Sequence, residues 1–347
     1  MADSTSGWRV KALTAGDEPR WDDFVRRTES ATFFHLSGWR NVVSRAFRHR
    51  SHYLYAERAG VTGAVLPLFH MRSRLFGNAL VSTPFCSYGG IASVDSGAAD
   101  ALVAAAGILA RELHVDYLEM RNIESGGRDW PSKDLYVTFR VPVGSDPEAN
   151  FKALSGKRRN MVRRGKRNGL TADVHAEVDG HYAIYAEMVR NLGTPVYSRR
   201  YFRLLKAEFG DDCEMLRIKH DDNVVSSMMS FFFRDEMLVY YGGGTKAAQD
   251  LAANDFLYWS LIERACERGA RLVDFGRSKR ESGSCRFKEL WGWEPHQLHY
   301  EYRLINAAEV PNLSPTNPKY RPLINAWKRL PVPLTRLIGP PLARNLG

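Results

Sequence analysis

Residues 272–295, LVDFGRSKRESGSCRFKELWGWEP, combine a short apolar run, a turn, several cations and several aromatic rings in one segment. Leu272, Val273 and Asp274 predict a buried strand that ends in a carboxylate, and Gly276 permits a sharp turn directly after it. This mixture suits an anionic, partly planar ligand better than a core, because a core would have to desolvate every charge. A surface loop with a tryptophan anchor is the alternative interpretation. The cations and rings after the turn are Arg277, Lys279, Arg280, Lys288, Phe287, Trp291 and Trp293.

The tripeptide Asp274-Phe275-Gly276 also occurs at the magnesium-binding loop of protein kinases. Here no glycine-rich phosphate loop of the kinase kind precedes it, and no HRD-type catalytic loop lies upstream. The sequence therefore excludes a kinase.

Composition indicates a folded protein with an anionic partner. The chain has 347 residues, of which 44% are hydrophobic, and this length is enough for two ordinary domains. Lys and Arg number 49 against 39 Asp and Glu, so the net charge of +10 favours nucleic acid, an acidic lipid surface or a phosphorylated substrate. The four cysteines are scattered without metal-ligand spacing, which predicts reduced thiols and no metal site. No apolar run approaches the ~20 residues of a membrane span, so we expect a cytoplasmic protein.

Hydrophobic periodicity predicts the same order of elements twice along the chain. The first half gives a strand, two helices, three strands, a helix and two strands, at 8–13, 17–29, from 37, 53–58, 61–71, 78–82, 98–114, 117–122 and 136–143. The second half repeats this order at 170–174, 180–191, 199–209, 213–220, 224–234, 236–244, 249–268, 271–276 and 297–304. We predict an α/β fold in which helices on a mixed sheet are used twice, with one large α/β domain as the alternative. The expected domains are 1–145 and 146–306, followed by a proline-punctuated basic tail at 307–347.

A dense basic segment lies between the two halves. Residues 157–167 hold seven cations, which a short helix would present to solvent as a phosphate-binding stripe. An ordinary basic helix face is the alternative. The residues expected to bind substrate here are Arg158, Arg159, Asn160 and Arg163.

The tail is interrupted by prolines, so it is expected to form short pieces instead of one long helix. Its cations alternate with Leu, Ile and Trp327. Two interpretations remain open: peripheral contact with an anionic membrane surface, which would be the inner face of the cytoplasmic membrane, or cover for its own domain.

The predicted element order resembles the GNAT acyltransferase fold, and two tandem copies resemble the FemAB/FemX peptidyltransferase group. The long coiled-coil arm of some Fem members has no counterpart in this chain. Taken together, the motifs are similar to the FemAB-like proteins that accompany exosortase/PEP-CTERM and exopolysaccharide gene sets. The motifs that carry the resemblance are RRNMVRRGKRNGL from Arg158, LGTP from Leu192, YYGGG from Tyr240, DFGRSK from Asp274, Phe287-Lys288 with WGWEP, NPKY from Asn317 and WKRLP from Trp327.

This resemblance implies transfer of an acyl group to an amine of a cell-envelope precursor, in Fem enzymes an aminoacyl group from aminoacyl-tRNA. Lys288 matches the family lysine that serves the reacting end of the donor, where a fixed cation stabilises the oxyanion and the leaving alkoxide. Arg158, Arg159 and Arg163 match the arginines that hold substrate phosphates by charge-assisted bonds. No permanently bound cofactor is implied, and the donor is aminoacyl-tRNA or acyl-CoA.

Asp274 and Tyr241 are the candidates for a general base, although a proton relay through the substrate would need neither. We expect Lys288, Asp274 and Tyr241 to line one cleft in the second half. Three glycines at 242–244 offer backbone N–H groups to a phosphate, yet the Arg or Gln spacing of ordinary CoA-binding turns is absent. Two alternatives stay open: a CoA-dependent acetyltransferase acting on an amino sugar, and a non-catalytic protein that binds RNA or polysaccharide. The further residues expected to contact substrate are Tyr240, Arg277, Lys279, Phe287 and Trp291.

Overall fold

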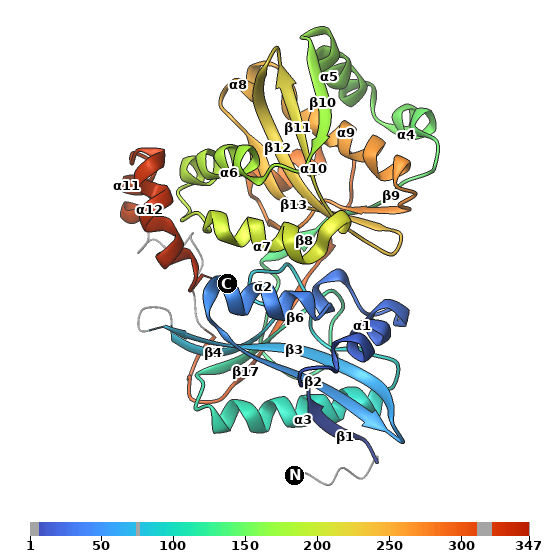
Figure 1. The fold of residues 1–347 in the computed structure, drawn as a ribbon, viewed down its shortest axis with the longest axis vertical. Coiled ribbons are helices and arrows are strands. Elements are labelled where there is room, and N and C mark those ends of the chain that lie inside the picture. The colour runs from blue at the N-terminus through green and yellow to red at the C-terminus, as the bar shows by residue number, and fades with distance from the viewer. Residues whose placement is uncertain (1–6, 74–76, 311–320, 347) are drawn as a thin grey trace. The chain divides into compact units, whose positions relative to one another are not determined.

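The computed structural model describes residues 7–73, 77–310 and 321–346 (Figure 1). The chain divides into two compact units. The first comprises residues 1–136, 297–314 and 344–347, and the second comprises residues 137–296 and 315–343. Each unit is a mixed β-sheet with helices on both faces, as the two predicted copies of an α/β fold require.

The first unit is built on an eight-stranded sheet of order β1-β2-β3-β4-β6-β17-β7, with β5 paired to β3. Strands β4 and β6 run parallel, and the pairs β1–β2, β2–β3, β3–β4 and β6–β17 run antiparallel. The elements are β1 (Arg9–Ala12), α1 (Glu18–Arg27), the short 3-10 helix η1 (Phe33–His35), α2 (Gly38–Phe47), β2 (Arg50–Arg58), β3 (Val61–Ser73), β4 (Gly77–Ser82), β5 (Ala92–Ser93), α3 (Ser96–Glu112), β6 (Tyr117–Asn122), β7 (Ser132–Lys133) and β17 (His299–Leu304).

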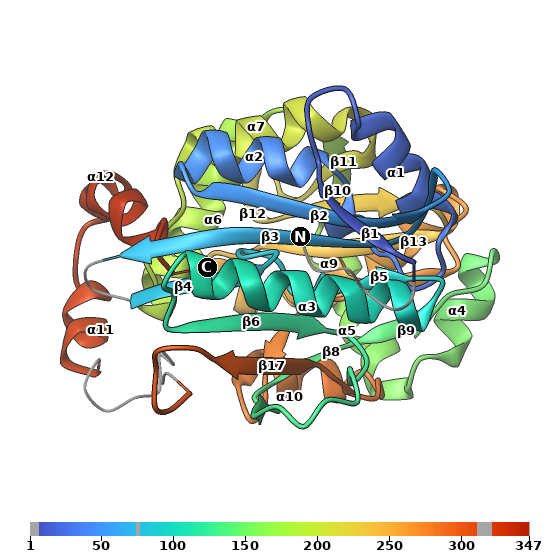
Figure 2. The same ribbon diagram turned by 90° about the horizontal axis from the view of Figure 1, so that it is seen from below.

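Helix α3 covers one face of this sheet, and α1 and α2 cover the other (Figures 1 and 2). Helix α3 has a capped N-terminus, because the Asp95 side chain accepts a hydrogen bond from Ala98 N at 2.9 Å. Ala98, Leu102 and Ala106 are buried at helical spacing, and the two alanines are small enough to let the helix approach the sheet closely. The first core therefore lies between α3 and the central strands.

The second unit has a six-stranded sheet of order β10-β11-β12-β13-β14-β9 and a small sheet of order β15-β8-β16. Only β13 and β14 run parallel among the paired strands of the larger sheet, as far as the structure describes them. Its elements are β8 (Tyr136–Thr138), β9 (Arg140–Pro142), α4 (Pro147–Ala153), α5 (Gly156–Arg167), β10 (Leu170–His175), α6 (Val178–Leu192), α7 (Arg199–Phe209), the 3-10 helix η2 (Gly210–Asp212), β11 (Cys213–His220), β12 (Asn223–Phe233), β13 (Glu236–Gly244), α8 (Ala247–Asp250), α9 (Ala253–Glu267), β14 (Leu272–Asp274), β15 (Ser278–Lys279), α10 (Gly283–Glu289), β16 (His296–Gln297), α11 (Arg321–Trp327) and α12 (Val332–Ala343).

Alternate residues of the central strands of the second unit pack on opposite helices. Met237 and Val239 of β13 belong to the same buried cluster as Phe256 and Trp259 of α9. Tyr241, beyond a β-bulge, instead contacts rings of α6 and α7. The central strands of the sheet are consequently buried on both faces.

The last strand of each half completes the sheet of the other half. Strand β9, expected at 136–143 as the end of the first copy, pairs with β14 through Val141 and Val273 in the second unit. Strand β17, expected as the end of the second copy, pairs with β6 in the first unit, where Tyr302 lies opposite Glu119. The order of elements is otherwise as predicted, and the fold is two tandem GNAT-like units. The unit boundary falls at 136/137 instead of 145/146, because β9 and its flanking residues pack in the second core.

The described part of the tail forms two short helices, α11 and α12, as its prolines predicted. The NPKY motif at 317–320 lies outside the described residues. Among the described helices, none is long and apolar enough to cross a membrane.

Candidate active site

Lys288 is a buried residue of the segment 272–295. It lies in α10, which Ser282 caps by accepting a hydrogen bond from Cys285 N at 3.2 Å. Its ammonium donates to Phe275 O at 2.6 Å, Gly276 O at 2.8 Å and Ser278 Oγ at 3.0 Å. An ammonium has three donors, so the loop at 275–278 supplies an acceptor for each of them. Lys288 is thus a fixed cation beneath that loop.

Burial strongly affects the protonation of Lys288. Its side chain is 4% exposed, and this desolvation lowers its pKa from 10.5 to about 8. The negative charge of Asp274 acts in the opposite direction and favours the ammonium. The lysine therefore changes charge close to neutral pH, which is the range that suits general acid–base chemistry.

Asp274 lies at the carboxyl end of β14 and is also buried. One of its oxygens accepts hydrogen bonds from Thr138 Oγ1 and, at 2.7 Å, from Gly276 N. Its other oxygen lies 3.5 Å from the Arg140 guanidinium. These contacts make Asp274 the anchor of the loop and the counter-charge of Lys288.

Gly276 allows the chain to turn out of the sheet at this point. Its φ of +74° is a conformation that disfavours side chains, and a Cβ there would lie only 2.7 Å from Val239 O. The parallel pairing of β13 with β14 ends at Leu238 and Asp274, while β13 continues to Gly244. The strand ends of a parallel pair and the connection between them are where α/β sheets bind ligands.

Tyr241 lies apart from Lys288 and Asp274. A β-bulge opposite Met229 and Ser230 precedes it and turns its ring towards α6 and α7. There its hydroxyl is 2.7 Å from that of Tyr201, and its ring makes an edge contact with Tyr185. Contacts of the described residues thus join Lys288 and Asp274 around one loop and place Tyr241 in a separate aromatic cluster. They do not support the expectation that all three line one cleft.

Tyr240 is the extra residue of that bulge and is half-buried, with its ring against Tyr241. The three glycines that follow were expected to offer N–H groups to a phosphate. They belong to β13 and pair on one edge with β12, where Gly242, Gly243 and Gly244 lie opposite Met228, Ser227 and Ser226, while the pairing of β13 with β14 ends earlier, at Leu238.

Helix α9 begins near the end of β13, where Asn254 lies close to Gly244. Its cap residue, Ala252, has a left-handed backbone and provides no side-chain hydrogen bond to the first turn. The N–H groups at the start of a helix attract anions when they lack a cap. Asp255 in the first turn pairs with Arg158 at 2.7 Å, which brings the basic helix α5 against this end of α9.

Arg158 is the clearest correction among the predicted substrate-binding residues. It was expected to point outward with the other cations, but it is buried and bonded to Asp255, which is buried as well. Burial raises the pKa of Asp255, and the Arg158 charge opposes this shift. The pair fixes α5 to α9. The Arg158 guanidinium therefore bonds to another side chain of the protein and is not presented to solvent.

The neighbouring residues of α5 stay closer to the surface. Asn160 and Arg163 are exposed, and the Arg163 guanidinium lies 5.5 Å from the ring centre of Phe151. Arg159 is half-buried and donates to Lys152 O at 2.7 Å. The remaining exposed cations of this helix are Lys157, Arg164, Lys166 and Arg167.

The aromatic residues after Lys288 anchor α10 to the core. Trp291 is buried in the cluster that contains α9, and its ring packs on Tyr258 and Trp293. Phe287 is half-buried with an edge contact to Tyr258 at 5.0 Å. The loop cations differ, since Arg277 is exposed and Lys279 is half-buried with a pKa lowered by burial.

Sequence reasoning missed His181, which lies fully buried on the α6 face of the sheet. Its Nδ1 is 3.0 Å from Ser227 Oγ, and its Nε2 has no hydrogen-bond partner among the described residues. Burial lowers its pKa from 6.5 to about 3. Nothing in the local pattern distinguishes it from an exposed helical histidine, because its partner comes from a distant strand.

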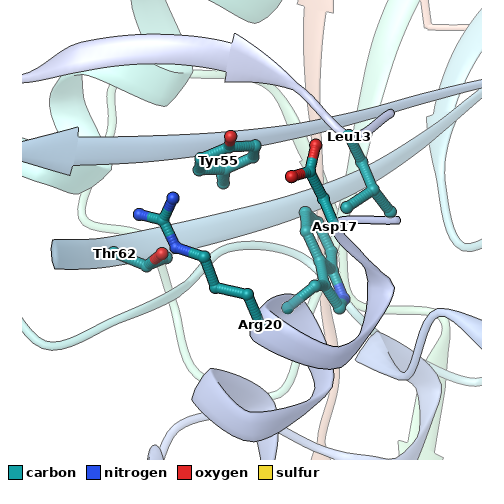
Figure 3. Close-up of a pocket in the computed structure, with 6 residues that line it drawn as sticks. Leu13, Asp17, Arg20, Tyr55 and Thr62 are labelled. Carbon is teal, nitrogen blue, oxygen red and sulfur yellow. The ribbon is translucent and has the colours of Figure 1, made fainter. Parts of the chain in front are cut away.

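A small hollow in the first unit is lined by Leu13, Asp17, Arg20, Tyr55 and Thr62 together with Trp21 (Figure 3). Arg20 donates to Glu57 at 2.9 Å and to Gly60 O at 2.8 Å. Its charge is therefore satisfied by the protein, and the hollow is structural. In the described ranges, no group of three or more His, Cys, Asp and Glu residues is arranged to hold a metal.

Residues 154–289 match the family described as an acetyltransferase (GNAT) domain. The matched range begins just before α5 and ends at the end of α10, so it contains Lys288, Asp274 and Tyr241. Most of the second unit therefore matches this domain family.

Solved structures resemble the whole chain. FemX covers 91% of it with 13% identity and a TM-score of 0.66, and 100% of FemX is matched. L-PGS from Bacillus licheniformis covers 94% with 15% identity and a TM-score of 0.56, with 99% of that chain matched. A tandem GNAT protein from the clavulanic acid biosynthesis pathway covers 88% with 13% identity and a TM-score of 0.55, with 100% matched. Comparison with curated proteins gives no match.

Proposed function

We propose that this chain is an N-acyltransferase that moves an acyl or aminoacyl group onto an amine of a cell-envelope or exopolysaccharide precursor. The observation that carries the proposal is the pairing of a GNAT-type domain with a buried cation of lowered pKa at the end of its parallel strand pair. The acceptor class comes from the resemblance to FemAB-like proteins, and it is consistent with the basic charge of the chain.

The reaction forms one bond and breaks another at the same carbonyl carbon. The acceptor amine attacks as a neutral nucleophile, so an N–C bond forms and the carbonyl oxygen becomes an oxyanion. Collapse of this intermediate breaks the C–O bond of an ester or the C–S bond of a thioester. The proton lost by the amine finally passes to the leaving group or to solvent.

In this proposal Lys288 contributes its charge and its hold on the loop at 275–278. All three of its donors are used within the protein, so we treat it as a positioning residue whose field favours the developing negative charge. Asp274 keeps Lys288 protonated and fixes the loop from the other side. The exposed Arg277 lies on the same loop and is suited to contact an anionic donor or acceptor.

The first turn of α9 is the proposed site for a donor phosphate, and the cations of α5 lie beside it. The match to an acetyltransferase domain favours acyl-CoA as the donor. Aminoacyl-tRNA is the second candidate, favoured by the resemblance to Fem proteins and by the exposed cations of α5.

Mass spectrometry of ligands that co-purify with the native protein is the first test. An acyl-CoA species or a charged tRNA would identify the donor. The purified protein should then bind that donor in calorimetry and consume it when a primary amine is supplied. Lys288→Met should lower this turnover by roughly 10²- to 10³-fold, the magnitude seen when one preorganised group that stabilises the developing negative charge is removed. Turnover equal to that of the wild type in Lys288→Met would refute the site, and failure to bind either donor would refute the proposed reaction.

A further inference from the structure

Helix α12 buries small residues and exposes large apolar ones, whereas an ordinary surface helix buries its large apolar residues. Thr335, Gly339 and Ala343, spaced by four residues, form its buried face. Leu337 is 74% exposed and Leu334 is 41% exposed on the opposite side. Ile338 and Leu342 extend the exposed apolar side at the spacing of successive helical turns. A surface helix that served only to cover its domain would turn its large apolar residues inward.

Close contacts fix the buried face of α12 against its unit, so the helix cannot rotate about its axis to bury its leucines. A Cβ at Gly339 would lie 3.0 Å from Val196, so the helix approaches its unit closely through small residues. Arg336 donates to Ala183 O at 3.3 Å, and its guanidinium lies 5.6 Å from the ring centre of Tyr182 in α6. The large apolar side chains of α12 are therefore held facing outward.

The apolar surface continues from α12 onto α11 and the end of α6. Leu323 of α11 is 69% exposed, and Leu192 at the end of α6 is 62% exposed. Ile324 and Lys328 lie against Gly193, which joins α11 to that end of α6. Figure 1 shows α11 and α12, in red, next to α6. We call this set the tail surface: Leu192, Leu323, Leu334, Leu337, Ile338 and Leu342.

Cations accompany the tail surface, and acidic residues are absent from this part of the sequence. No Asp or Glu occurs between positions 310 and 347. Arg321, Lys328 and Arg329 are exposed on or directly after α11. A second copy of the chain docked on this surface would bring these like charges together, whereas anionic headgroups would neutralise them.

We propose that the tail surface docks on the face of an anionic phospholipid bilayer. Helix α12 has 12 residues, too few for the ~20 of a membrane span, so it lies in the plane of the interface. Its leucines enter the boundary between headgroups and acyl chains, and Lys328 and Arg329 contact lipid phosphates. This proposal does not rest on the proposed acyl transfer.

Co-sedimentation of the full chain with phospholipid vesicles tests the proposal. Vesicles of phosphatidylcholine alone are compared with vesicles that also contain phosphatidylglycerol, at low and at high salt. The wild type should bind the vesicles with phosphatidylglycerol, and added salt should weaken this binding. In the variant Leu334→Gln/Leu337→Gln/Leu342→Gln, each substitution should lower the partition coefficient by roughly tenfold. In Lys328→Gln/Arg329→Gln, each lost cation should lower it by roughly fivefold.

Ile108→Gln is the matched control, because Ile108 is an exposed apolar residue of α3, a helix of the first unit, whereas the tail surface belongs to the second. It should bind vesicles as the wild type does, and circular dichroism should show that every variant is folded. Three results would overturn the proposal: no vesicle binding by the wild type, equal binding to both lipid compositions, or unchanged binding by the triple variant. A wild-type dimer that the triple variant converts to a monomer in light scattering would instead show that this face joins two copies of the chain.

Discussion

Replacing Lys288 by Met tests the candidate site most directly. Methionine has a similar length and is apolar, so the change removes the charge and the three hydrogen bonds to the loop at 275–278. The pKa of about 8, against 10.5 for an ordinary lysine, means that holding this ammonium in the folded state costs roughly 3 kcal/mol. Leaving three loop acceptors without a donor costs about 1–3 kcal/mol each where they stay buried. The two effects oppose each other, so we expect a net destabilisation of about 0–6 kcal/mol, smallest where water reaches the freed acceptors, together with a large loss of turnover.

The pH dependence follows from the direction of the pKa shift. Between about pH 8 and pH 10.5 the unfolded chain binds the Lys288 proton and the folded chain has released it. Unfolding free energy from this residue therefore rises with pH across that window and is lower below it. Turnover should behave in the opposite way, falling as pH rises through about 8, because the cation is lost.

A direct titration separates these expectations from the identity of the donor. Lysine side chains labelled with carbon-13 are followed by NMR against pH, and the Lys288 signal is assigned by its absence in Lys288→Met. Its midpoint should lie near 8. Asp274→Asn should move the midpoint lower, because the carboxylate favours the ammonium.

A Lys288 signal that titrates near 10.5 would refute the burial argument. A midpoint that Asp274→Asn leaves unchanged would refute the pairing of the two charges. Turnover that stays level through pH 8 while the NMR midpoint is confirmed would show that the charge of Lys288 is structural and not part of the chemistry.

Three further predictions concern other charged groups of the second unit. Arg158→Met should destabilise the protein by roughly 3–5 kcal/mol in urea unfolding, because it leaves Asp255 buried without its partner. The double variant Arg158→Met/Asp255→Leu should recover much of that loss. Equal losses in both variants would contradict a destabilisation caused by the unpaired carboxylate. His181 has a folded pKa of about 3, below its unfolded 6.5, so stability should be lost as pH falls below 6.5, by roughly 2 kcal/mol at pH 5, and His181→Gln should lack this dependence. Arg159→Gln/Arg163→Gln should weaken binding of an anionic donor in calorimetry at low salt while changing the unfolding free energy by about 1 kcal/mol or less, and affinity unchanged at low salt would show that these cations are only a solvated face.

Hydrophobic periodicity was sufficient to predict the repeated order of the main elements, because the long strands and helices of both units each bury one face. It could not assign the last strand of each half to a sheet. A short segment such as Arg140–Pro142 or His299–Leu304 indicates an extended, half-buried chain, but its pairing depends on which edge strand it meets. The edges it meets are β14 and β6, and neither is adjacent to it in sequence.

The candidate site shows the same limit at the level of single residues. Lys288 and Asp274 lie close in sequence, and the turn at Gly276 brings them together, so their association was predictable. The face of the sheet on which Tyr241 lies was not predictable, because a β-bulge changes the alternation of side chains between Val239 and Tyr241. Arg158 could not be distinguished from its exposed neighbours, since its burial depends on Asp255 from a helix far along the chain.

The exchanged strands bear on how such a tandem protein can be divided. Residues 1–145 contain β9 without β14 and lack β17, which leaves the backbone groups of β6 without their partner strand. Residues 146–306 lack β9, so β14, the strand that ends in Asp274, becomes an edge. Unpaired strand edges are prone to associate with other chains. Each sheet therefore needs a strand from the other half of the sequence, and the loop that positions Lys288 depends on residues encoded before the basic helix α5.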